Sequence, residues 1–139
     1  MRPAVGVGVM ITRDGEVLLG RRRGAHGAGA FGWPGGGLAF GESLESAVHR
    51  EAYEEAGLTV REFKLVCVSN VVEYGRHYVD FEFMVTAFDG TPEVREPEYI
   101  ESWNWYPQSS PPEPLFQPCR LALESLRSGQ FLNDSPPDR

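Results

Sequence analysis

Hydrophobic and polar residues alternate along two pairs of segments, and each pair predicts a β-hairpin. The first pair turns at Arg13-Asp14-Gly15, and the second turns near Tyr74-Gly75. A short aromatic segment later in the chain predicts one more strand, because the proline-rich stretch after it cannot continue a sheet. The predicted strands are residues 4–12, 17–20, 58–72, 77–88 and 101–106.

Two further segments have the hydrophobic spacing of helices. Ser43 is a suitable N-cap for a helix that continues through Ala56, and Gly57 is a typical residue just past a helix end. A second helix is expected at residues 115–126, where apolar side chains recur every three or four positions. The eight glycines and one proline of residues 24–41 instead predict a loop with unusual backbone angles.

This order of elements, β-β-loop-α-β-β-β-α, predicts an α/β fold in which a mixed sheet packs between helices. The 139 residues are enough for about one domain, which we expect at residues 1–128. The polar, proline-rich tail of residues 129–139 is expected to fray. The longest apolar run, around residues 7–11, is far shorter than the ~20 residues of a membrane span, and no signal peptide is evident. We therefore expect a cytoplasmic protein without a membrane partner.

Charge narrows the range of partners. Lysine and arginine number 13 and aspartate and glutamate number 20, so the net charge is −7. Such an acidic chain lacks the basic surface of a protein that binds polymeric nucleic acid. It can still bind a small anion where a metal ion or a local basic cluster reverses the field. Cys67 and Cys119 match no metal-binding or redox spacing, so reduced thiols are expected.

Acidic residues interrupt the apolar stripe of the first predicted helix. On a helical wheel that starts at Leu44, this stripe includes Ala47 and is expected to face the core. Glu51 falls at about 340° and Glu55 at about 20°, in the middle of the stripe, and Glu54 lies at its edge at about 280°. A solvated acidic face is the ordinary interpretation of such a run, but it would not place carboxylates within the apolar stripe.

A divalent cation would resolve this conflict. Glu51 and Glu55 are one helical turn apart, so their like charges repel, and burying ionised carboxylates without partners costs several kcal/mol or more. Carboxylate oxygens are typical ligands of Mg²⁺ or Mn²⁺ rather than of zinc. The helix is therefore a candidate metal site.

The segment around this helix resembles the signature of the Nudix hydrolase family. Residues 36–58 read G-x5-E-x7-R-E-x-x-E-E-x-G-L, and every fixed position of that signature is filled. These fixed positions are Gly36, Glu42, Arg50, Glu51, Glu54, Glu55 and Gly57. The order of elements is also similar to the Nudix α/β/α sandwich with a mixed sheet over nearly the whole chain.

The resemblance implies roles for individual residues. Glu51 and Glu55 look like ligands of Mg²⁺, for which Mn²⁺ can substitute, and Glu54 looks like a third ligand or a bridge to a second ion. The Gly35 carbonyl is similar to one that completes the metal shell. The catalytic residues would be Glu51, Glu54 and Arg50: either glutamate is a candidate general base, and Arg50 would orient them. A further metal-binding glutamate from a distant loop would be Glu98 or Glu101, between which the sequence does not decide.

Three other stretches, RPAVGVGV, LLGRRRGAHGAGAF and EPEYIESWNWY, resemble small MutT-type Nudix enzymes, most of all the animal and plant branch that removes oxidised nucleoside triphosphates. In that branch the segment corresponding to residues 114–120 closes over the base. Gln117 departs from that branch, which tends to have tryptophan there, and Trp33 replaces a smaller apolar residue. The candidate substrate-binding residues are Arg22, Trp33, Phe116 and Cys119.

The function that the resemblance implies is Mg²⁺-dependent hydrolysis of a nucleoside triphosphate, including an oxidised one such as 8-oxo-dGTP, to monophosphate and pyrophosphate. The alternative substrates are ADP-ribose-like or non-nucleotide diphosphates. A non-catalytic domain that senses a nucleotide is the alternative of another class, although such domains usually lose carboxylates of the signature. A homodimer is left open.

Overall fold

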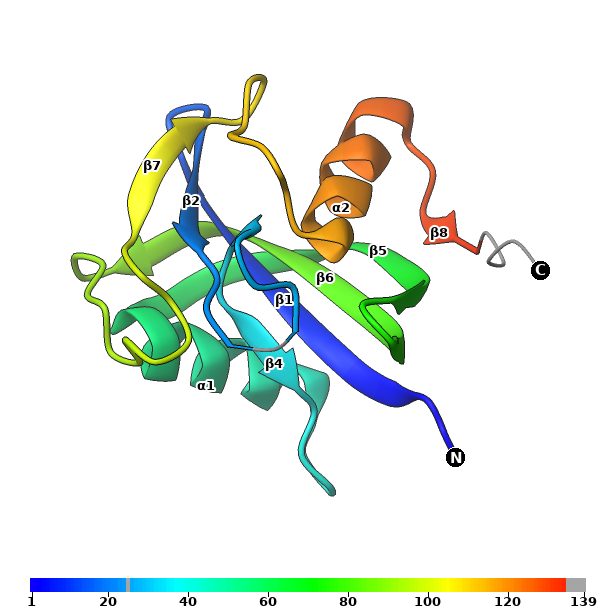
Figure 1. The fold of residues 1–139 in the computed structure, drawn as a ribbon. Helices are drawn as coiled ribbons and strands as arrows, with labels where there is room; N and C mark the ends of the chain where they lie inside the picture. Colours follow the sequence, from blue (N-terminus) through cyan, green and yellow to red (C-terminus); the bar gives the residue numbers. More distant parts are fainter. Residues whose placement is uncertain (25, 135–139) are drawn as a thin grey trace.

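The computed structural model describes residues 1–24 and 26–134, which form one mixed sheet with a helix on each face (Figure 1). The first half of the chain forms four strands and a helix, and the second half adds four strands and a second helix. In chain order the elements are β1 (Ala4–Arg13), β2 (Glu16–Arg21), β3 (Phe31–Gly32), β4 (Gly35–Gly37), α1 (Leu44–Ala56), β5 (Thr59–Glu73), β6 (Arg76–Asp89), β7 (Asn104–Pro107), α2 (Gln117–Ser128) and β8 (Leu132–Asn133).

The sheet has the strand order β3-β2-β1-β6-β5-β8, with β4 also paired to β1 and β7 also paired to β2. The two predicted hairpins are present as antiparallel pairs, β1 with β2 and β5 with β6. The hairpins are joined through β1 and β6, which run parallel. The predicted α/β fold with a mixed sheet is therefore confirmed.

Two apolar cores separate the sheet from its helices. The α1 side is filled by alternate residues of β1, including Val7 and Val9, which pack with Ala47 and Val48 of the helix. The α2 side contains Met10, Cys67 and Cys119, and the two cysteines are buried free thiols. Because side chains of a strand alternate between its faces, β1 contributes to both cores.

Local sequence explains the bounds of α1. The Ser43 hydroxyl accepts a hydrogen bond from the Ser46 N–H at 3.1 Å, and Gly57 adopts the left-handed conformation at φ 71° that commonly ends a helix. The helix predicted from Ser43 to Ala56 is therefore confirmed to its ends. Within the described residues, neither helix is long and apolar enough to cross a membrane.

Three expectations about local structure are wrong in part. Residues 24–41 are not a continuous loop, because β3 and β4 form within them by pairing to β2 and β1. The second helix begins at Gln117 rather than at Leu115, because Leu115 is extended and bridges to Phe31. The tail does not fray throughout: β8 pairs in parallel with β5, and residues 135–139 lie outside the described residues.

Candidate active site

Helix α1 places two carboxylates inside the protein. The exposed fractions of Glu51 and Glu55 are only 6% and 8%, so the burial predicted from the helical wheel is confirmed. Strand β4 covers both residues. The Gly35 N–H donates a hydrogen bond of 2.6 Å to Glu55 Oε2, and a Cβ atom at Gly36 would lie 2.6 Å from Glu51 Oε1. A side chain at position 36 would therefore displace the Glu51 carboxylate from this position.

Arg50 of α1 links Glu42, which precedes the helix, to Glu51 and Glu54 within it. Its Nε donates to Glu42 Oε2 at 2.6 Å, and its Nη1 donates to Glu51 Oε1 at 2.8 Å and to Glu54 Oε1 at 3.1 Å. Its Nη2 also donates to the Gly37 carbonyl at 3.0 Å, which ties the helix to β4. The hydrogen bond from the guanidinium lowers the pKa of Glu42 to about 2. Arg50 therefore positions the carboxylates of both Glu51 and Glu54.

The buried carboxylates are short of positive charge. Burial raises the pKa of Glu55 to about 9, and the adjacent Glu51 carboxyl adds to this effect, whereas the hydrogen bond from Gly35 opposes it. Burial also raises the pKa of Glu96, and the charges of Glu51 and Glu54 raise it further. Four carboxyl groups thus influence one another, and among residues 1–24 and 26–134 the one guanidinium that binds Glu51 is that of Arg50.

This donor set fits a divalent cation. Within residues 1–24 and 26–134, no three acidic, histidine or cysteine side chains converge as a complete metal-ligand cluster. Glu51 and Glu55 nevertheless form a buried oxygen-donor pair whose charge a cation would neutralise. Glu54 is half exposed and accepts from Arg50 Nη1 through Oε1 only, so its second carboxylate oxygen is available to a cation.

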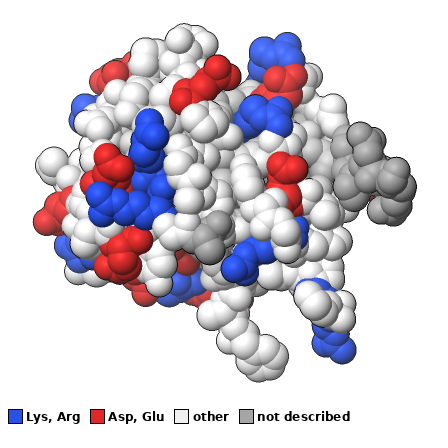
Figure 2. All heavy atoms as spheres, in the orientation of Figure 1, with Lys and Arg blue, Asp and Glu red and all other residues white. Residues whose placement is uncertain are grey.

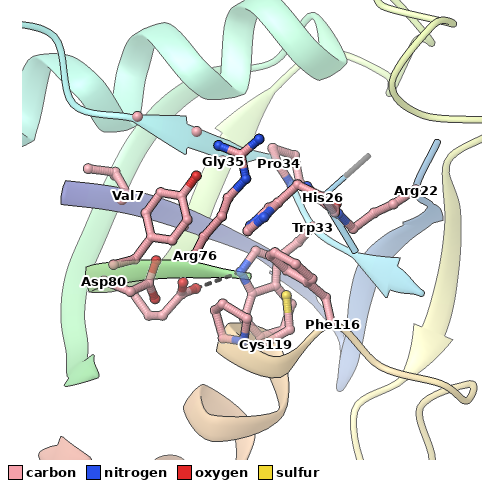
Figure 3. Close-up of a pocket in the computed structure, with 17 residues that line it drawn as sticks. Val7, Arg22, His26, Trp33, Pro34, Gly35, Arg76, Asp80, Phe116 and Cys119 are labelled. Carbon is pink, nitrogen blue, oxygen red and sulfur yellow. Dashed lines mark hydrogen bonds between the residues drawn. The ribbon is translucent and has the colours of Figure 1, made fainter. Parts of the chain in front are cut away.

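Strand β4 also borders a cavity of about 260 Å³ (Figure 3). The cavity lies between the sheet and the beginning of α2, and Gly35–Gly37 form part of its wall. Its other walls come from β1, β6, the loop after β2 and the start of α2. Residues whose side chains line it include Arg22, His26, Trp33, Arg76, Tyr78, Asp80, Glu82, Phe116 and Cys119.

The comparison with known families identifies the chain. The NUDIX domain profile matches residues 2–121. The chain belongs to the NUDIX family. The Nudix-type sandwich and the Nudix hydrolase family that the signature predicted are thereby confirmed. We call the signature segment, residues 36–58, the Nudix box; it contains the carboxylates of α1.

Solved Nudix structures share this fold over most of their length. The chain is 39% identical to a MutT NUDIX hydrolase from Burkholderia pseudomallei, with a TM-score of 0.85, covering 89% of this chain and 98% of that one. It is 27% identical to the E. coli ORF135 protein, with a TM-score of 0.71 and 94% of each chain covered.

Curated relatives match over a smaller region. The RNA pyrophosphohydrolase of Mannheimia succiniciproducens is 43% identical over 68 residues, which are 49% of this chain and 32% of that protein. That of Proteus mirabilis is 43% identical over 65 residues, or 47% of this chain and 35% of that protein. The chain thus matches about a third of the length of these relatives.

The Nudix fold brings together all four residues proposed to bind substrate. Arg22, Trp33, Phe116 and Cys119 all line the cavity. The Arg22 guanidinium is already engaged, because it stacks 3.9 Å from the centre of the Phe116 ring and donates to the His26 carbonyl at 3.0 and 3.1 Å. Its burial lowers the pKa of Arg22. In this arrangement Arg22 supports the aromatic wall of the cavity rather than projecting freely from it.

Sequence reasoning missed Glu96 and the acidic residues of β6. Glu98 and Glu101 were the expected loop glutamates, yet both are exposed, and Glu96 is the partly buried one whose pKa responds to Glu51. The alternation at residues 78–83 does predict that Asp80 and Glu82 share one face of a strand. It does not reveal that α2 covers this face.

Proposed function

We propose that this Nudix domain is a Mg²⁺-dependent pyrophosphohydrolase that converts a nucleoside triphosphate to its monophosphate and pyrophosphate. The observation that carries the proposal is the buried carboxylate pair Glu51–Glu55, which lacks enough positive charge to balance it. This pair lies behind β4, a strand that also borders the cavity. Glu51 and Glu55, with Glu54 and the Gly35 carbonyl, would hold the metal. When bound, Mg²⁺ or Mn²⁺ neutralises phosphate charge and lowers the pKa of water.

The chain's own residues supply position and proton transfer. Arg50 holds Glu51 and Glu54 through one nitrogen, so it fixes the two candidate general bases relative to each other. Glu54 is the more accessible to water, with half of its side chain exposed, whereas Glu51 is buried. The cavity beyond β4 would take the base, with aromatic faces from Phe116 and Trp33.

The test is a panel of Mg²⁺ reactions whose products are separated by ion-exchange chromatography. The panel contains the ordinary nucleoside triphosphates, 8-oxo-dGTP, ADP-ribose and a short 5′-triphosphorylated RNA. We expect monophosphate and pyrophosphate from at least one nucleoside triphosphate, and a loss of at least about 100-fold in Glu55→Gln, since a key electrostatic contact contributes roughly 3 kcal/mol. Glu45→Gln, on the exposed side of α1, is the control and should retain activity.

Other outcomes would replace this proposal. Turnover confined to ADP-ribose would indicate a diphosphate substrate, and tight binding without turnover would indicate a sensor. Turnover confined to RNA would agree with the curated relatives, which are named RNA pyrophosphohydrolases. The described surface favours the small substrate, because acidic and basic side chains are interspersed on the face in Figure 2 and the chain carries a net charge of −7. The cytoplasmic location and the homodimer stay predictions.

A further inference from the structure

Two acidic side chains form the floor of the cavity. Asp80 and Glu82 lie two residues apart on β6, so both point toward the α2 side of the sheet. They are almost fully buried, with exposed fractions of 6% and 2%. Figure 3 shows Asp80 directed into the cavity below the Arg76 guanidinium. Neither residue belongs to the Nudix box.

Two glycines of β1 make room for this acidic pair. In the parallel register of β1 and β6, Gly6 is opposite Asp80 and Gly8 is opposite Glu82. A Cβ atom at Gly8 would overlap both carboxyl oxygens of Glu82, and one at Gly6 would lie 3.0 Å from Asp80 Oδ1. The glycines and the acidic residues therefore form one complementary unit.

The two carboxyl groups differ in their hydrogen bonding. Glu82 Oε1 accepts a hydrogen bond of 2.7 Å from Trp33 Nε1–H, which fixes its orientation. Asp80 Oδ2 is buried and has no hydrogen-bond partner among the described residues. Burial raises the pKa of Asp80, and burial and the adjacent Asp80 raise that of Glu82. A buried acceptor left without a donor is unfavourable, so this atom is suited to a donor from a ligand.

We propose that Asp80 determines base specificity by accepting a hydrogen bond from the amino group of a nucleobase. The inference rests on the proposed function, because it names the substrate class of the same site: nucleotides of cytosine, adenine or guanine rather than their oxo analogues. Trp33 holds Glu82, the acidic neighbour of Asp80 on β6, through the hydrogen bond from its Nε1–H. A carbonyl oxygen in place of the amino group would bring two acceptors together, and sites built to bind a donor reject analogues that lack it strongly.

The experiment uses pairs of substrates that differ only in the amino group. The pairs are dCTP with dUTP, dATP with dITP, and dGTP with dXTP, and kcat/KM is measured for each with Mg²⁺. Binding of dCMP and dUMP, of dAMP and dIMP, and of dGMP and dXMP is measured in parallel by calorimetry in EDTA. We expect the amino member of at least one pair to be preferred by at least about tenfold.

Asp80→Ala should reduce that preference to within about threefold. Its melting temperature should be equal or higher, because the change removes a buried carboxyl without a partner. Asp89→Ala, at the exposed end of the same strand, is the matched control and should keep the preference. The comparison within the native protein needs no variant, so the absence of any preference overturns the role of Asp80 even if Asp80→Ala does not fold.

The outcomes separate this inference from the proposed function. Turnover without preference in any pair, or a preference that folded Asp80→Ala retains, overturns the role of Asp80 and leaves the pyrophosphohydrolase intact. A preference in monophosphate binding that Asp80→Ala abolishes, without turnover of any triphosphate, supports the role of Asp80 and overturns the proposed function.

Discussion

Replacing Glu55 by glutamine should change how stability depends on pH. The pKa of Glu55 is about 9 in the folded protein and ordinarily 4.5, so the folded state holds one more proton than the unfolded state between these values. Its contribution to the free energy of unfolding is therefore greatest below about pH 4.5. Between about pH 4.5 and pH 9 this contribution falls by about 1.4 kcal/mol for each pH unit. Between about pH 5 and pH 7 this amounts to about 3 kcal/mol.

Glutamine removes this proton uptake while keeping the local contacts. Its amide oxygen can accept the hydrogen bond from Gly35 N–H, and its amide N–H₂ can donate to Glu51. Urea unfolding in EDTA, followed by tryptophan fluorescence at several pH values, measures the effect. The stability of Glu55→Gln relative to the native protein should increase by about 3 kcal/mol between about pH 5 and pH 7.

The control for this series is Glu45→Gln. Glu45 is exposed in the first turn of α1, so its substitution removes only a helix-dipole interaction. The free energy of unfolding should therefore change by about 0.3–1 kcal/mol, and this change should be nearly the same at every pH of the series. Parallel pH profiles for Glu55→Gln and the native protein would refute the argument, because they would mean that Glu55 titrates alike in both states.

Three further outcomes are expected. Mg²⁺ or Mn²⁺ should raise the melting temperature, because binding adds about 2.7 kcal/mol to the free energy of unfolding at a hundredfold excess over Kd. A melting temperature that changes with neither metal nor EDTA would contradict a metal site at Glu51 and Glu55. Activity should rise with pH in steady-state assays, because the raised pKa of Glu55 opposes the ionisation that metal binding needs; an acidic optimum would contradict this. Gly8→Ala should destabilise the fold by about 1–3 kcal/mol in urea melts by crowding Glu82, and Glu82→Ala should rescue it; additive losses would exclude that contact.

Features set by local sequence were predictable. The ends of α1 follow from Ser43 and Gly57, whose capping acts within one helical turn. The burial of Glu51 and Glu55 follows from helical periodicity, because their apolar neighbours must face the core whatever the remaining fold. The hairpin turn before β6 was also predictable from Tyr74-Gly75 between two alternating segments. Both residues adopt positive φ there.

Features that depend on distant contacts were not predictable in the same way. Strand β4 is only three residues long and exists through its pairing with β1, so the glycine-rich sequence alone indicates a loop. Glu96 approaches the site because its loop packs on the end of α1, where Trp103 Nε1 donates to the Glu55 carbonyl. The pair Asp80 and Glu82 depends on the register of two strands and on a helix more than thirty residues later.

Strand β4 has a consequence for how this domain can diversify. The acidic residues of the Nudix box lie on α1, whereas Asp80 and Glu82 lie on β6, and β4 borders both groups. Substitutions on β6 can therefore alter what the cavity accepts while the hydrolytic helix stays unchanged. A substitution in β4 has no such freedom, because a side chain at Gly36 would displace Glu51. New substrate preferences should thus arise on β6 and α2, whereas Gly35 and Gly36 of β4 should tolerate almost no variation, because a Cβ atom at either would lie 2.6 Å from a neighbouring oxygen.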